Sequence, residues 1–110
     1  MGRKASSDAL LILASLSDEP RHGYAIKKDI AARTAGDVRL GSTTLYRLLS
    51  QLLDQGLIEE QHARPSPALD DERRRYYRVT PAGRRALAAE RQRLERVLLA
   101  LRSAGGTRAR

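Results

Sequence analysis

Three hydroxyl side chains and one arginine stand close together in the segment GSTTLYRLLSQLLDQGLIEE, residues 41–60. Serine and threonine hydroxyls both donate and accept hydrogen bonds, and an arginine guanidinium presents its N–H donors in a planar fork. Such groups bind phosphate oxygens and the edges of bases without making or breaking a covalent bond. Their spacing therefore points to recognition of a polyanion rather than to catalysis.

The leucines of this segment predict a helix over about residues 42–55, which Gly56 ends. At 100° per residue the leucines share one side, and Thr43, Arg47, Ser50 and Gln51 fall on the other. A small, polar first turn lets backbone N–H groups approach phosphate closely, and the helix dipole favours negative charge there. We expect DNA contacts from Ser42, Thr43, Thr44, Arg47, Ser50 and Gln51.

Tyr46 lies about 100° from the centre of the leucine side, at the boundary between the two sides. Its ring can pack while its hydroxyl donates to a phosphate, which would make it a DNA-contacting residue. An ordinary partly buried tyrosine explains the position equally well. The residues alone leave both interpretations open.

Groups that could perform catalysis are scarce. The chain has no cysteine, and His22 and His62 lie far apart without a cluster of carboxylates around either. Each histidine is best interpreted as a solvated loop residue, because metal sites need several convergent ligands. With no nucleophile beside a base, we expect neither an enzyme nor a metal or other cofactor.

The balance of charges indicates a polyanionic partner. The 110 residues carry 21 Lys and Arg against 13 Asp and Glu, a formal net charge of +8. Such an excess favours phosphate backbones through counterion release. One domain with an aliphatic core is expected, because the chain has four tyrosines and no Phe or Trp. The apolar run at residues 10–13 is too short to cross a membrane, so we expect a cytoplasmic protein.

The order of predicted elements is helix, helix, helix, hairpin and helix, which is typical of a winged helix-turn-helix. The first three helices span about residues 8–16, 22–34 and 42–55, and the strands span residues 57–64 and 73–80. The fold class is therefore mostly α with a small β-hairpin. Residues 1–80 would form the DNA-binding domain, residues 81–103 a dimerisation helix that Thr80 caps, and residues 104–110 a disordered basic tail.

The C-terminal helix has an apolar stripe suited to pairing with a second copy. Leu87, Leu94 and Leu101 recur every seven residues, and Val97 and Leu98 fill the gap between the last two. At about 1.5 Å per residue this helix exceeds 30 Å, so its distal half would stay exposed without a partner. A two-fold dimer would set two recognition helices about 34 Å apart and predicts an inverted-repeat operator.

Three linked motifs make the chain similar to the PadR family of transcriptional regulators. They are HGYAIKKDI with Gly23 and Tyr24, TLY at residues 44–46, and RRRYYRVTPAGRRAL with Tyr76, Tyr77, Thr80 and Gly83. The likeness covers about residues 8–102. It implies a homodimeric DNA-binding repressor whose C-terminal helix carries the dimer contact. For Tyr46 the resemblance favours the phosphate contact, so Tyr46 joins the expected DNA-binding residues.

The wing departs from the family pattern, which has glycine and basic residues at its tip. Here the tip is PSPALDDE, and its acidic groups would repel phosphate. We therefore expect the strands rather than the tip to contact DNA. The expected wing contacts are Arg64, Arg73, Arg74 and Arg75.

Lys27 and Lys28 of the second helix are further expected phosphate partners, although a lysine pair on an outer helix face is often only solvated. Together these features predict a sequence-specific, homodimeric repressor of transcription that binds double-stranded DNA, with release by a small-molecule effector or another signal. The alternative is a winged-helix module that binds proteins through its long helix and does not read DNA.

Overall fold

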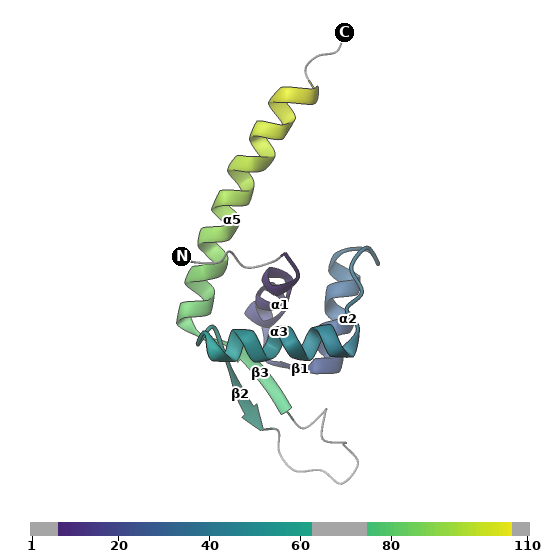
Figure 1. Ribbon diagram of the computed structural model, residues 1–110, viewed down its shortest axis with the longest axis vertical. Coiled ribbons are helices and arrows are strands. Elements are labelled where there is room, and N and C mark those ends of the chain that lie inside the picture. Colours follow the sequence, from purple (N-terminus) through teal and green to yellow (C-terminus); the bar gives the residue numbers. More distant parts are fainter. Residues whose placement is uncertain (1–6, 63–74, 107–110) are drawn as a thin grey trace.

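The computed structural model describes residues 7–62 and 75–106. Its elements run in the order α1 (Ser7–Asp18), β1 (Arg21–His22), α2 (Gly23–Arg33), α3 (Ser42–Asp54), β2 (Ile58–His62), β3 (Arg75–Val79), α5 (Pro81–Leu101) and η1 (Arg102–Gly106). Helices α1, α2 and α3 pack around one core, the strands extend below α3, and α5 rises away from that body (Figure 1). The fold is a winged helix-turn-helix with a long C-terminal helix, as predicted.

The sheet has one strand more than the predicted hairpin. Its order is β1-β3-β2, and both pairings are antiparallel. The added strand β1 has two residues, Arg21 and His22, which lie opposite Tyr77 and Tyr76. Sequence periodicity could not reveal it, because two residues show no alternation. Tyr77 and Val79 of β3 face inward, since both are buried.

The core is aliphatic except for Tyr77. Its buried apolar members are Ala9, Leu10, Ile12, Leu13, Leu16, Ile26, Ile30, Leu45, Leu48, Leu49, Leu52, Ile58, Tyr77 and Val79. Helix α1 is buried on several sides, because its apolar residues follow one another closely. Because α1, α2, α3, β2 and β3 all contribute to this one cluster, α3 is held in place on its leucine side.

Thr80 joins the end of α3 to the start of α5. Its Oγ1 accepts from the backbone N–H of Gly83 at 3.1 Å and donates to the carbonyl of Gly56 at 2.7 Å. Pro81 occupies the first turn of α5, as predicted. At Gly83 an added Cβ would clash with the carbonyl oxygen of Leu57, so only glycine allows the helix to approach this closely.

Beyond α5 the chain remains helical for longer than expected. A disordered tail was predicted from residue 104, but residues Arg102–Gly106 continue as a π-helical turn. Residues 107–110 lie outside the described part of the chain. The helical rod therefore extends over more than six turns from Pro81.

Candidate nucleic-acid interface

Helix α3 presents the predicted polar side to solvent. Leu45, Leu48, Leu49 and Leu52 are buried, while Ser42, Thr43, Arg47, Ser50 and Gln51 are exposed. Thr44 is half-buried at the boundary. None of the ion pairs between described residues includes Arg47, so its guanidinium is available for an external acceptor. The side that was expected to meet DNA is open.

The first turn of α3 keeps its backbone donors uncapped. Its N-cap residue is Gly41, which makes no side-chain hydrogen bond to the helix. In contrast, His22 caps α2 through its Nδ1 and Thr80 caps α5 through its hydroxyl. The unpaired N–H groups at a helix start carry the positive end of its dipole and bind anions well. Gly41 was not among the predicted site residues, although a glycine just before Ser42 indicates a helix start without a side-chain cap.

Lys27 adds a positive charge beside this turn. Its Nζ donates to Ser42 Oγ at 2.9 Å, which links α2 to the start of α3. The Ser42 hydroxyl accepts this bond and keeps its own proton to donate elsewhere. Lys28 points in another direction, with its Nζ 5.3 Å from the ring centroid of Tyr24. The structure thus places only Lys27 of the predicted pair at the first turn of α3.

The hydroxyl of Tyr46 does not face outward, which corrects one of the two interpretations of this residue. Its oxygen is buried. The phenol lies over Gly23 of α2, where an added Cβ would clash with Tyr46 Oη. Tyr46 is therefore a packing residue that sets the distance between α2 and α3, and a phosphate contact through its hydroxyl is wrong for this structure.

The arginines of the described wing strands are paired with glutamates of the neighbouring strand. Arg75 Nε lies 3.5 Å from Glu60 Oε2, and Arg78 Nε donates to Glu59 Oε2 at 2.6 Å. Arg75 is exposed, but its charge is already partly compensated. The other predicted wing contacts, Arg64, Arg73 and Arg74, lie outside the described residues.

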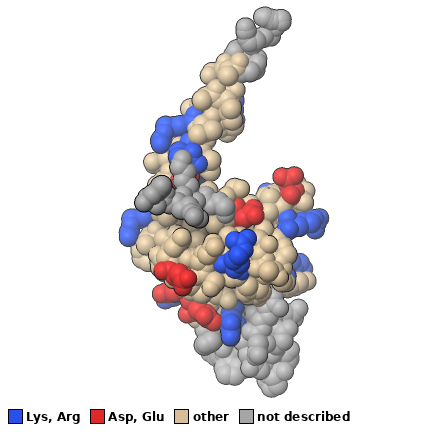
Figure 2. Space-filling model, viewed as in Figure 1, with Lys and Arg blue, Asp and Glu red and all other residues tan. Residues whose placement is uncertain are grey.

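Acidic groups gather where α3 ends and the wing begins. Asp54, Glu59 and Glu60 are all exposed there. In the face shown by Figure 2, red side chains gather at the lower left of the body and others lie toward its upper right, whereas blue side chains are spread over its middle, its edges and the long helix. Since phosphate avoids carboxylates, this distribution favours the N-terminal half of α3 over its C-terminal end as the anion-binding part.

His22 is not a solvated loop residue, which corrects the expectation for it. It belongs to β1, and its Nδ1 accepts from the N–H of Ala25 at 3.1 Å. Its ring packs edge-on against Tyr76, with centroids 5.4 Å apart. Histidine is not among the common N-cap residues, so the usual capping pattern could not identify it.

A network of ion pairs fixes α2 to α1 and β1. Arg33 Nε donates to Asp29 Oδ2 at 2.7 Å and its other end binds Asp18, while Arg21 lies 3.6 Å from Asp29. Burial raises the pKa of Asp29, but the hydrogen bond from Arg33 and the charge of Arg21 outweigh it, so this pKa lies below its ordinary value. The hydrogen bonds that Arg33 donates to Asp29 and to Asp18 raise the pKa of Arg33.

The distal half of α5 exposes an apolar stripe. The exposed fractions are 43% for Leu94, 40% for Val97, 47% for Leu98 and 64% for Leu101. Leu87 departs from the prediction, because it is partly buried against the core of its own chain. The reason is its position on the proximal half of α5, which packs on α1. Four of the five predicted interface residues therefore lie on the unpartnered surface.

The described residues can also be considered as ligands of a metal ion or as a membrane span. No group of three or more His, Asp or Glu side chains within residues 7–62 and 75–106 could hold a metal ion. None of the helices in those ranges combines the length and apolar character needed to cross a bilayer.

Comparisons with known proteins agree with the geometry. A family model for the transcriptional regulator PadR-like family matches residues 12–89. The transcriptional regulator Rv3488 of Mycobacterium tuberculosis is 34% identical over 86 residues, which are 78% of this chain and 74% of the relative.

Solved structures share the fold. A transcriptional regulator from Clostridium thermocellum has a TM-score of 0.75 at 26% identity, covering 88% of this chain and 91% of that one. Bacillus subtilis PadR in complex with operator DNA has a TM-score of 0.66 at 20% identity, covering 76% of this chain and 46% of that chain. From the match over most of its length, the chain belongs to the PadR-like family of transcriptional regulators.

Proposed function

We propose that this protein is a homodimeric repressor that binds an inverted-repeat operator through α3. The observation that carries the proposal is the uncapped, exposed first turn of α3, with Lys27 bonded to Ser42 beside it and Arg47 projecting from the next turn. The N–H groups and hydroxyls of this turn would bind phosphate, and Arg47 would read a base in the major groove. A bidentate arginine is the commonest reader of guanine.

A neighbour in the fold supports this use of the surface. Bacillus subtilis PadR has been solved with operator DNA bound. The present chain shares its fold, and its own recognition helix is open at the residues that a major-groove contact needs. The net charge of +8 favours the same partner. We infer that the protein acts in the cytoplasm, on double-stranded DNA.

The dimer would form through the distal half of α5. Leu94, Val97, Leu98 and Leu101 present apolar surface that the other described residues leave exposed. Two copies joined there by a two-fold axis would carry two α3 helices to successive major-groove faces, about one helical turn apart. Repression would follow when the bound dimer blocks a promoter, and a small-molecule effector or another signal would release it.

The competing function is a protein-interaction module, which the exposed stripe of α5 favours. The dependence of affinity on salt concentration distinguishes the two functions, because phosphate contacts release counterions and apolar contacts do not. We would titrate the protein with a labelled mixed-sequence duplex at several salt concentrations. With about six phosphate contacts, the slope of log affinity against log salt should be near −5. A flat slope, or absence of binding at low salt, would contradict DNA binding.

A further inference from the structure

We propose that Tyr24 and Lys28 of α2 form a second phosphate-binding contact, separate from the first turn of α3, that holds the DNA backbone between α3 and the wing. The inference deepens the proposed function and rests on it. Tyr24 lies in the first turn of α2 and Lys28 one turn further along the helix. Both side chains line one shallow hollow of the surface, together with Arg21, His22, Ala25, Asp29 and Ala32.

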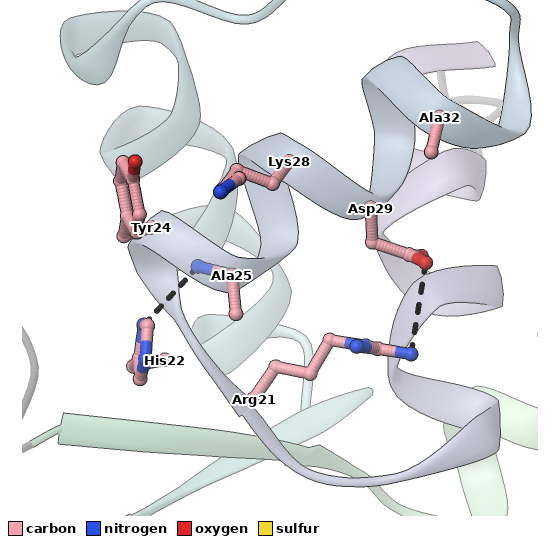
Figure 3. A pocket seen from close by; sticks show the side chains of 7 residues that line it. All are labelled: Arg21, His22, Tyr24, Ala25, Lys28, Asp29 and Ala32. Atoms are coloured by element: carbon pink, nitrogen blue, oxygen red, sulfur yellow. Dashed lines mark hydrogen bonds and ion pairs between the residues drawn. The ribbon is translucent and has the colours of Figure 1, made fainter.

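The two groups are held close to each other. The Lys28 Nζ lies 5.3 Å from the Tyr24 ring centroid, and Figure 3 shows the lysine side chain extended toward that ring. Tyr24 is 41% exposed, so part of its side chain can meet a ligand. A cation over a tyrosine ring is attracted by the negative face of the ring, which keeps the ammonium near the phenol. An ammonium and a phenol together can donate to two oxygens of one phosphate.

His22 orients the tyrosine. The His22 and Tyr24 rings are stacked with centroids 6.4 Å apart, and the edge of Tyr76 supports His22 from β3. The His22 Nδ1 is fixed by the N–H of Ala25, so the imidazole has little freedom to turn. The ring of Tyr24 is therefore presented from a rigid support, which lowers the entropy lost when it binds a ligand.

Lys28 supplies the uncompensated charge of this hollow. Arg21 is surrounded by carboxylates, with Glu19 at 3.3 Å, Asp29 at 3.6 Å and Asp18 at 4.0 Å. Asp29 in turn is engaged by Arg33. Among the described residues Lys28 belongs to no ion pair, and its ammonium lies over the Tyr24 ring in a cation–π contact. An anion that enters the hollow would therefore meet a positive charge that is not yet neutralised.

The position of the hollow favours DNA as the source of that anion. Gly23, next to Tyr24, packs against Tyr46 of α3, and Lys27, next to Lys28, bonds to Ser42. On the other side, β1 pairs with β3, the strand that leads out of the wing. A duplex that contacts both the first turn of α3 and the wing must pass the start of α2, so its backbone would reach Lys28.

The test measures affinity against salt for a labelled mixed-sequence duplex of about 30 base pairs, which offers phosphates without a particular operator. Lys28→Gln should reduce the slope of log affinity against log salt by about 0.9 for each protomer bound, and Lys28→Arg should retain the slope. Tyr24→Phe keeps the ring but removes the hydroxyl, so affinity should fall about fivefold with the slope unchanged.

The matched control is Arg96→Gln, which removes one charge from an exposed position on α5. Arg96 is two residues from Leu94 and thus lies on the opposite side of that helix. The slope of log affinity against log salt for Arg96→Gln should equal that of the wild type. Thermal unfolding of all variants would verify that the fold is intact, as expected for exposed positions.

The inference is overturned if Lys28→Gln and Arg96→Gln have the same slope, or if Tyr24→Phe binds as tightly as the wild type. A steep wild-type slope with either of these results leaves the proposed function standing and removes only this contact. A flat wild-type slope overturns both together.

Discussion

Arg47 is the side chain on which base reading would depend. It projects from the exposed side of α3, one turn beyond Thr43. Arg47→Ala should weaken binding to the selected operator by about 1–3 kcal/mol, because a bidentate contact to one base is lost. Footprinting on that operator would show the loss, while circular dichroism should show an unchanged fold. An unaltered footprint would contradict the role of α3 as the recognition helix.

Gly41 offers a test that adds a group rather than removing one. Its φ of −76° suits any residue, and an added Cβ would meet nothing within 4 Å. Gly41→Asp should cap the first turn of α3 and leave stability equal or higher by a few tenths of a kcal/mol. The carboxylate would occupy the N–H groups and repel phosphate, so DNA affinity should fall at least about tenfold.

The neutral variant Gly41→Asn separates the charge from the cap. Asparagine caps about as well as aspartate but carries no charge, so its loss of affinity should be smaller. Both variants would be compared by anisotropy with a labelled duplex. If Gly41→Asp bound DNA as tightly as the wild type, the first turn of α3 could not be the phosphate-binding site.

Whether the position of a side chain was predicted correctly depended on whether its contacts lie close to it in the sequence. Thr43 and Arg47 were placed correctly because helical spacing alone fixes the side on which they lie. Tyr46 was not, because its hydroxyl rests on Gly23, a neighbour 23 positions away in the chain that no periodicity within α3 could reveal. The pairing of Arg75 with Glu60 likewise depends on the strand register.

The ion-pair network gives α2 a dependence on pH. The folded-state pKa of Asp29 lies below its ordinary value of 3.8, so the unfolded chain binds this proton more tightly. Its contribution to the free energy of unfolding is therefore complete above this ordinary value and is lost as pH falls through the folded-state pKa. Because these groups are only partly buried, that contribution should be about 1 kcal/mol at neutral pH.

Asp29→Asn isolates this contribution, since asparagine keeps the shape and cannot ionise. Urea unfolding of both proteins from pH 7 to pH 3 should give a difference in stability that is constant near neutrality and shrinks below about pH 4. Acid affects the other carboxylates in both proteins alike. A difference that stayed constant down to pH 3 would show that the Asp29 carboxylate is not stabilised by its partners.

Among the elements, those with strong local signals were predicted and those held by distant partners were not. Thr80 and Pro81 marked the start of α5, and Gly56, with a φ of 73°, marked the end of α3. Strand β1 was missed because its two residues gain strand geometry only from pairing with β3. The N-cap of α2 was also missed, because it is the imidazole of His22 and histidine is not among the usual N-cap residues.

Assembly of the molecule would depend on the distal half of α5. Leu94→Glu places a charge in the proposed apolar contact, where burying it without a partner is costly. We expect a monomer by sedimentation, with the thermal stability of the winged body retained. A dimer that persisted would show that the interface lies elsewhere.

Leu87 provides the matched control for that variant, because it lies on the same helix but packs on its own core. Leu87→Ala should lower the free energy of unfolding by about 1–2 kcal/mol, as expected for a partly buried leucine. Its association state should remain that of the wild type. Loss of the dimer in Leu87→Ala would move the proposed interface toward the proximal half of α5.

The central claim is that two copies of α3 read one DNA site together. Selection of bound sequences from a pool of random duplexes tests it most directly. We expect enrichment of an inverted repeat whose half-sites are centred about 10 base pairs apart or a multiple of that, and none for Gly41→Asp. Enrichment of an unsymmetrical site would contradict the dimer, and no enrichment by the wild type would contradict sequence reading by α3.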